Sequence, residues 1–257
     1  MITQALITEI INDQVQHRNL TDYVPRAIMK QINPLKKNKE IIVISGLRRC
    51  GKSTVLQQLR KEAKHADYYF NFEDDRLVNF TVADFQILLE TFIKMFGVQK
   101  TFYFDEIQNI AGWERFVRRL YGEGNKIYLT GSNATLLSKE LGTRLTGRYI
   151  PIEMYPYSFA ELVNHENPVL VEAQNYSTQQ KGQLKRLFSK YCDSGGIPDY
   201  VRYKQTDYLH ALYQSILYRD IVTRYKLSSE KSFKELVFYL ASNIGKDISF
   251  NALRKML

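Results

Sequence analysis

Gly46-Leu47-Arg48-Arg49-Cys50-Gly51-Lys52-Ser53-Thr54, residues 46–54, matches the phosphate-binding loop G-x-x-x-x-G-K-[ST]. The two glycines let the backbone curl so that several N–H groups point inward at phosphate oxygens. Lys52 can reach the β- and γ-phosphates, and the Ser53 hydroxyl can ligate Mg²⁺. All nine residues are therefore expected to contact a nucleoside triphosphate and its metal ion, although a glycine-containing turn that binds nothing is the simpler alternative.

The residues on either side of this loop favour the nucleotide interpretation. Residues 40–45 form a short, apolar, β-branched run, which is typical of a buried parallel strand. After the loop, apolar residues recur at helical spacing, namely Val55, Leu56, Leu59 and Ala63. The helix that they predict would begin at the loop, so its positive end would add to the anion site.

A second motif lies at 101–106, where the apolar run Thr101–Phe104 ends in Asp105 and Glu106. Carboxylates at the carboxyl end of a strand beside the loop-bearing strand can face the nucleotide. We expect Asp105 to hold Mg²⁺, directly or through water, and Glu106 to polarise an attacking water as a general base. A strand followed by a solvated acidic turn is the alternative.

A third strand is predicted at 126–130, followed by Gly131, Ser132 and Asn133. Ser132 at this strand end is a candidate for contact with the γ-phosphate. Ser132 and Asn133 are equally good N-caps for a following helix, so both interpretations stay open.

The composition is that of an ordinary soluble globular protein: the 257 residues are 44% hydrophobic and 25% charged. No run reaches membrane-spanning length, and the N-terminus does not read as a secretion signal, so we expect no membrane contact. Cys50 and Cys192 form neither a metal-binding pair nor a disulfide framework, which favours the reduced cytoplasm. The net charge of +9 is compatible with DNA binding, but a solvated basic surface explains it as well.

Strands are predicted near 41–45, 68–72, 101–105, 126–130 and 148–153, with helices such as 84–96 between them. Their alternation indicates an α/β fold: a three-layer sandwich with a mainly parallel five-stranded sheet. We expect four parts: a helical lead-in at 1–40, a nucleotide-binding core at 41–155, a helical lid at 156–228, and a segment at 229–257. Residues 164–182 are expected to be a loop. Two short helices in the last segment would suit the start of a winged helix, from a longer protein.

Seven segments taken in order resemble one family. They are the loop 46–54, Tyr69–Asp74, Phe104–Gln108, Leu129–Ser132, Leu145–Arg148, Pro156–Glu161 and Gly195–Pro198. Their order and spacing are similar to those of bacterial and archaeal AAA-type P-loop ATPases, in the clade that carries a C-terminal nuclease-like domain. The resemblance covers about residues 20 to 250, and it implies ATP and Mg²⁺ as ligands.

The resemblance also implies two further roles. The chain before the first strand would line the adenine pocket through Tyr23 and Pro25, although residues 23–26 could equally be a helix-start turn. An arginine near the end of the fifth strand, Arg148 rather than Arg144, would stabilise the transferred phosphate of a neighbouring subunit in a homo-oligomer. An exposed strand-end arginine is an equally good interpretation. Arg48 and Arg49 resemble the family's basic pair.

The leading hypothesis is thus an ATP hydrolase that moves its helical lid. A nucleotide-gated switch and a DNA-associated module with little turnover are the alternatives. A GTPase is disfavoured because no N-K-x-D tetrapeptide occurs, and a transporter-type ATPase because no L-S-G-G-Q-like signature occurs. A small-molecule kinase suits the Asp105–Glu106 pair less well than water activation does.

Overall fold

The computed structural model describes residues 2–16, 23–63, 66–132, 145, 147–172 and 175–256. The chain divides into two compact units, residues 1–204 and 205–257. The predicted boundaries at residues 155 and 228 do not coincide with this division. The first lid helices belong to the same unit as the sheet, and the long helix that begins at residue 206 does not.

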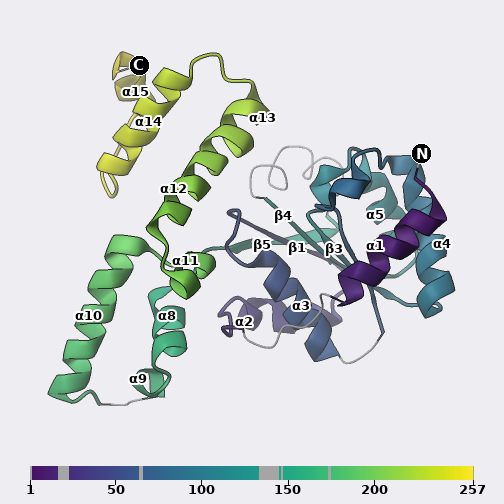
Figure 1. Ribbon diagram of the computed structural model, residues 1–257, viewed down its shortest axis with the longest axis horizontal. Coiled ribbons are helices and arrows are strands. Elements are labelled where there is room, and N and C mark those ends of the chain that lie inside the picture. The colour runs from purple at the N-terminus through teal and green to yellow at the C-terminus, as the bar shows by residue number, and fades with distance from the viewer. Residues whose placement is uncertain are drawn as a thin grey trace. The chain divides into compact units, whose positions relative to one another are not determined.

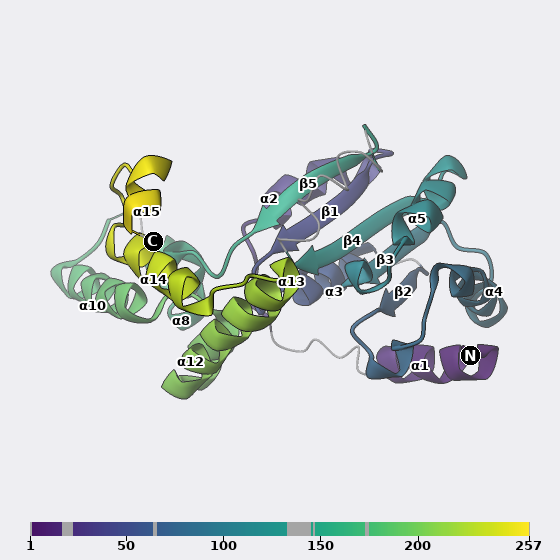
Figure 2. The ribbon, with the colours of Figure 1, turned by 90° about the horizontal axis from the view of Figure 1, so that it is seen from above.

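The sheet of the first unit has five parallel strands in the order β2-β3-β4-β1-β5. They are β1 (Ile41–Gly46), β2 (Tyr68–Asn71), β3 (Thr101–Asp105), β4 (Lys126–Ser132) and β5 (Tyr149–Met154). Each predicted strand is present, with ends that differ by at most two residues. The strands point the same way, so their carboxyl ends form one edge of the sheet (Figure 2).

Helices cover both faces of this sheet, as the α/β sandwich predicts (Figure 1). Successive side chains of a strand point to opposite faces. Ile41 and Val43 of β1 accordingly enter one core with α1 (Gln4–Gln16), α4 (Phe85–Phe96) and α5 (Trp113–Gly122). Ile42 and Ile44 enter the other core with α2 (Met29–Ile32) and α3 (Lys52–Ala63). The fold is thus the three-layer P-loop NTPase sandwich.

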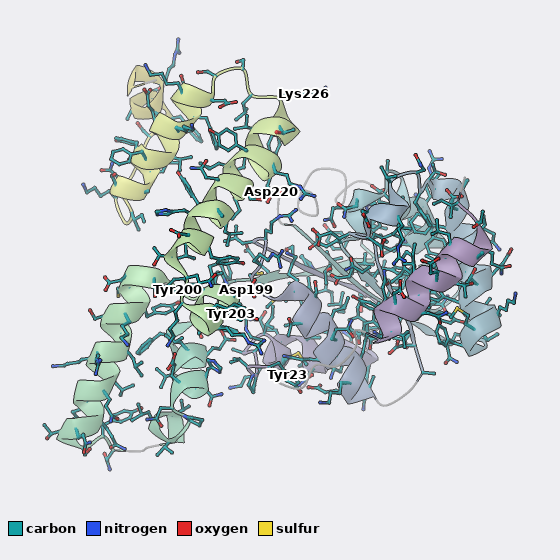
Figure 3. The ribbon with its side chains drawn as sticks, in the orientation of Figure 1. Tyr23, Asp199, Tyr200, Tyr203, Asp220 and Lys226 are labelled. Carbon is teal, nitrogen blue, oxygen red and sulfur yellow. The ribbon has the colours of Figure 1, made fainter. Side chains whose placement is uncertain are left out.

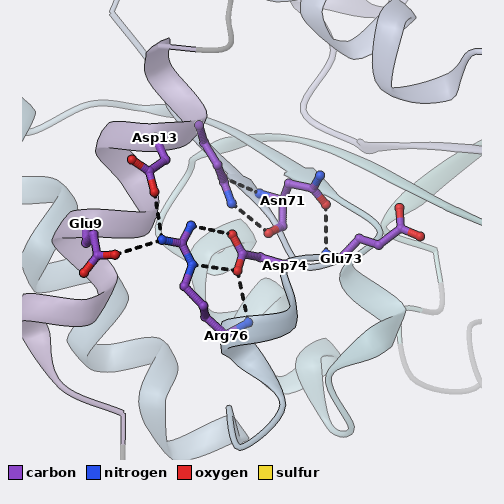
Figure 4. A network of polar contacts seen from close by, with 7 residues as sticks. Glu9, Asp13, Asn71, Glu73, Asp74 and Arg76 are labelled. Atoms are coloured by element: carbon purple, nitrogen blue, oxygen red, sulfur yellow. Dashed lines mark hydrogen bonds and ion pairs between the residues drawn. The ribbon is translucent and has the colours of Figure 1, made fainter.

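Helix α1 protects the edge strand β2, whose outer backbone would otherwise be unpaired. The side-chain amide of Gln14 imitates a neighbouring strand: its oxygen accepts from the Asn71 N–H at 2.8 Å, and its nitrogen donates to the Asn71 carbonyl at 3.0 Å. Arg76 adds an ionic anchor, with Asp13 at 2.7 Å and Asp74 at 2.8 Å (Figure 4). The predicted helical lead-in is therefore an integral part of the sheet's edge.

The lid portion of the first unit contains α8 (Phe159–Glu166), α9 (Val169–Glu172), α10 (Thr178–Ser194) and α11 (Pro198–Tyr203). The predicted capping box of Ser158 and Glu161 starts α8. The prediction of a loop over 164–182 is wrong, because α9 and the first turn of α10 lie there. Ser177 and Gln180 form a second capping box, a signal that was readable in the sequence.

The second unit is helical. A continuous run of helix comprises α12 (Thr206–Ser215), the π-helical segment η5 (Ile216–Val222) and α13 (Thr223–Tyr225). After it come α14 (Glu230–Ser242) and α15 (Phe250–Met256), and the Ser249 hydroxyl caps α15 by accepting from the Ala252 N–H at 3.1 Å. The assignment of α14 and α15 to a winged helix stays a prediction. Within the described part of the chain, no helix is both long enough and apolar enough to cross a bilayer.

Candidate active site

The phosphate-loop motif connects β1 to α3 at the carboxyl edge of the sheet. Gly46 is paired in register with Met154 of β5, and a Cβ at Gly46 would lie only 2.2 Å from the Met154 carbonyl oxygen. Arg49 and Gly51 both have positive φ, at 65° and 98°. The close approach at Gly46 and the left-handed φ at Gly51 therefore explain why the motif needs glycine at both positions.

A cleft of about 270 Å³ opens above this loop. Its lining comprises Arg48, Arg49, Gly51, Lys52, Ser53, Thr54, Glu73, Glu106, Pro198 and Asp199. Six of the nine predicted loop residues therefore line one cavity. Gly46, Leu47 and Cys50 do not: Cys50 is fully buried, and burial raises the pKa of its thiol.

Lys52 lines the cleft, and its side chain is almost completely buried. It donates to the carbonyls of Leu47 at 3.1 Å and Gly46 at 3.3 Å, and it lies 3.4 Å from Glu106 Oε1. The loop lysine and the predicted general base are thus in direct ionic contact.

Asp105 is completely buried at the end of β3, beside the loop. Its carboxylate accepts hydrogen bonds from the hydroxyls of Thr130, Ser53 and Tyr69. Burial raises the pKa of Asp105 to about 6, although the Thr130 and Ser53 hydroxyls favour the charged form. The two predicted metal ligands, Ser53 and Asp105, are therefore in contact with each other.

Glu106 adopts a left-handed backbone conformation, with φ of 51°, which is uncommon for a residue with a side chain. The turn directs its carboxylate back over the loop toward Lys52. The Glu106 N–H donates to the Thr130 hydroxyl at 3.0 Å, and that hydroxyl in turn donates to Asp105. Thr130 of β4 thus fixes both acids. Thr130 was not predicted as a site residue, although its place as a polar residue at the end of the strand beside β3 was the available signal.

The charges along the cleft nearly balance, which the sequence motif did not suggest. Arg48 Nη1 lies 3.1 Å from Glu73 Oε1, and Arg49 Nη1 lies 3.9 Å from Asp199 Oδ2. Asp199 lies in the first turn of α11, where Figure 3 labels it near Tyr200 and Tyr203. Glu73 and Asp199 were missed as site residues because only the tertiary fold brings them to the loop.

The predicted adenine segment contributes a different residue from those expected. Tyr23 lies beside α3 (Figure 3), where its ring centroid is 5.6 Å from the Lys61 ammonium. Pro25 is exposed. Neither residue lines the cleft, so adenine contact by them stays a prediction. Arg26 is the member of this segment that reaches the loop.

Arg26 is buried, and all three nitrogens of its guanidinium donate hydrogen bonds. It donates to Glu161 Oε1 at 2.9 Å, to the Cys50 carbonyl at 2.8 Å and to the Tyr155 carbonyl at 2.6 Å. It therefore links the phosphate loop, the end of β5 and the first helix of the lid. Because C=O and N–H point in opposite directions across a trans peptide, holding the Cys50 carbonyl also fixes the direction of the Gly51 N–H.

The predicted arginine at the fifth strand lies at the other edge of the sheet from the cleft. Arg148 immediately precedes β5 rather than ending it, and its carbonyl accepts from the Ile41 N–H at 2.9 Å, so it lies at the amino edge of the sheet. Five strand steps separate that edge from Gly46, roughly 17 Å, so Arg148 cannot reach the phosphates of its own chain. Ser132 ends β4 in register with Gly46, and its side chain is outside the described part of the structure.

Comparison with known proteins gives the same assignment as this geometry. Residues 38–163 match the family model described as an AAA domain. Residues 38–163 of this chain are an AAA-type domain with the P-loop NTPase fold. The match begins just before β1 and ends within α8, so it includes the loop, the acid pair and the capping box that Arg26 contacts.

Similar proteins extend beyond that domain. The uncharacterized protein MJ1544 of Methanocaldococcus jannaschii is 32% identical over 259 residues, which cover 99% of this chain and 57% of that protein. An uncharacterized protein of Haemophilus influenzae is 36% identical over 232 residues, covering 85% of this chain and 55% of its own length. The chain thus spans little more than half the length of these curated relatives. Among solved structures, the RuvB Holliday junction branch migration motor of Thermotoga maritima is 16% identical, covers 93% of this chain and 83% of its own, and has a TM-score of 0.44.

Proposed function

We propose that the cleft binds ATP with Mg²⁺ and hydrolyses it. The observation that carries this proposal is the meeting of four side chains from two strand ends. Ser53 is hydrogen-bonded to Asp105, and the Lys52 ammonium lies 3.4 Å from Glu106 Oε1. Hydroxyl and carboxylate oxygens are the donors that Mg²⁺ prefers, so Ser53 and Asp105 fit this ion. The match of residues 38–163 to an AAA domain also supports nucleotide binding in this cleft.

Each residue has a distinct chemical role in this proposal. Lys52 would exchange its contacts with the Gly46 and Leu47 carbonyls for the β- and γ-phosphate oxygens. Mg²⁺, when bound, would supply additional positive charge to the same oxygens. Glu106 would orient a water molecule and accept its proton, and Thr130 would hold Glu106 and Asp105 in place.

The lid is proposed to respond to the nucleotide. Pro198 and Asp199 of α11 line the cleft, and Arg26 connects the Cys50 carbonyl to Glu161 of α8. A triphosphate would compete with Asp199 for Arg49, which would alter the position of α11. This contact supports coupling between the cleft and the lid, whether the chain acts as a hydrolase or as a switch with little turnover. Action in the cytoplasm and assembly into a homo-oligomer that receives Arg148 from a neighbour are parts of the same proposal.

The test compares two substitutions in the same cleft. Glu106→Gln should keep ATP binding, measured by calorimetry with Mg²⁺, and lower phosphate release by about 10²–10⁴-fold, because it removes the proton acceptor. Glu73→Gln, which also lines the cleft but contacts Arg48, should change turnover only a few-fold. Equal turnover by wild type and Glu106→Gln would refute the assignment of the base. Absence of heat from ATP with the wild type would refute the whole proposal.

A further inference from the structure

A second polar groove lies at the amino edge of the sheet, away from the phosphate loop. It is lined by Arg115, Arg118, Arg119, Tyr121, Gly122 and Arg148. The first five belong to α5, and Arg148 is the residue immediately before β5. The C-terminal end of α5 and the start of β5 lie at the edge of the sheet where the strands begin (Figure 2). Four arginines therefore gather at one open groove.

The charge around this groove is almost entirely of one sign. Arg115, Arg118 and Arg119 are exposed, and the ammonium of Lys39 adds a fifth cation, 4.9 Å from the centre of the Tyr121 ring. Of the three α5 arginines, Arg119 alone forms an ion pair within the described part of the chain, with Glu123 at 3.8 Å. Arg115 and Arg118 thus differ from Arg48 and Arg49 of the nucleotide cleft, each of which faces a carboxylate.

The geometry favours a polymer of phosphates over a single small anion. Arg115, Arg118 and Arg119 have i, i+3 and i+4 spacing, which aligns them along one face of α5. They extend over about 6 Å of helix axis at 1.5 Å per residue. Guanidinium groups bind phosphate oxygens in a bidentate way, and successive phosphates of a DNA strand are separated by about 3.4 Å along the duplex axis. A row of exposed arginines in an open groove can therefore follow a phosphate backbone.

We propose that this arginine groove docks the phosphate backbone of duplex DNA. It goes beyond the proposed ATP hydrolysis and does not depend on the cleft of the same chain, because the groove and that cleft lie at opposite edges of the sheet. Arg148 belongs to both proposals, so a neighbouring copy that received Arg148 would compete with DNA for the groove. The contact is ionic and reads no base sequence, so it positions the protein on DNA without selecting a site. The net charge of +9 adds long-range attraction for the same partner.

The experiment measures anisotropy of a fluorescein-labelled mixed-sequence 20-base-pair duplex from low to physiological salt. The double variant Arg115→Gln/Arg118→Gln should weaken binding at least about tenfold and lower the slope of log K against log salt by about 1.8, since each lost phosphate contact removes about 0.9. The matched control Lys185→Gln/Arg186→Gln removes the same charge from exposed positions of α10 and should stay within about twofold of wild type. Glu123→Gln should tighten binding, because it removes the acid beside Arg119.

Several outcomes would overturn the proposal. They are an unchanged salt slope in the groove variant, an equal loss in the α10 control, and absence of binding by the wild type. If the groove variant instead lost turnover only at concentrations where copies associate, with DNA affinity unchanged, the groove would be an interface between copies. Lys52→Ala separates this proposal from the previous one, because it should abolish ATP binding and leave DNA binding intact.

Discussion

Replacing Arg26 with methionine should both destabilise the protein and weaken nucleotide binding. Methionine retains much of the side-chain length but removes three hydrogen bonds, to Glu161, Cys50 and Tyr155. Breaking a buried ion pair by removing one partner costs about 3–5 kcal/mol, because the other charge is left without compensation. Glu161 keeps its hydrogen bonds from the N–H groups of Ala27 and Ser158, so we expect a value near the lower limit, about 3 kcal/mol.

The expected loss of ATP affinity follows from the loss of the hydrogen bond between Arg26 and the Cys50 carbonyl. Without Arg26, the peptide between Cys50 and Gly51 can rotate, and the Gly51 N–H is no longer held toward the phosphates. We expect a loss of about tenfold in ATP affinity, equivalent to about 1.4 kcal/mol. Urea unfolding followed by circular dichroism measures the stability, and calorimetry with Mg²⁺ and ATP measures the affinity.

Arg60→Met is the matched control. Arg60 is also buried and donates to Asp67 Oδ1 at 2.6 Å and 2.9 Å, but it lies at the far end of α3 and does not line the cleft. It should cost a similar amount of stability and leave ATP affinity unchanged. If Arg26→Met changes stability by less than about 0.5 kcal/mol, or if Arg60→Met weakens ATP binding equally, the positioning role of Arg26 is wrong.

The pH dependence of stability gives an independent check on the same ion pair. Burial acts to raise the pKa of Glu161, but the N–H groups of Ser158 and Ala27 and the Arg26 guanidinium outweigh it and hold the pKa below its usual value. The stabilisation is therefore present above the unfolded-state pKa of about 4.3 and is lost as pH falls through the lower folded-state value. Wild type and Glu161→Gln should differ in unfolding free energy near pH 7 and converge below about pH 4.

Two further substitutions test other parts of the site and the fold. Asp199→Asn removes a negative charge 3.9 Å from Arg49, so ATP affinity measured by calorimetry should rise about two- to fivefold, and a decrease would show that Asp199 helps to bind the nucleotide. Lys126→Met removes the ammonium that donates to the carbonyls of Leu35, Asn38 and Glu40, at 3.0, 2.7 and 3.0 Å. It should lower the free energy of unfolding in urea by about 2–3 kcal/mol, and a change below about 0.5 kcal/mol would mean that water replaces the lysine.

Local sequence was sufficient to predict the parts of the site that depend on neighbouring residues. The loop at 46–54, the strand ending in Asp105 and Glu106, and the strand–helix alternation are each expressed within about ten residues. Parallel strands bring their carboxyl ends to one edge, so the loop and the acid pair could be predicted to meet there. The α/β sandwich and its five strands are confirmed for that reason.

The tertiary structure decided which distant residues complete the site. Arg26 and Glu161 are 135 positions apart in the sequence, and Arg26 and Tyr155 are 129 apart. Asp199 likewise reaches Arg49 only because α11 packs at the loop. Tertiary structure also decided that Arg148, which precedes β5, lies at the opposite edge of the sheet from the site. A residue's neighbours in sequence determine its backbone conformation, but the packing of whole elements determines which charges become close enough to pair.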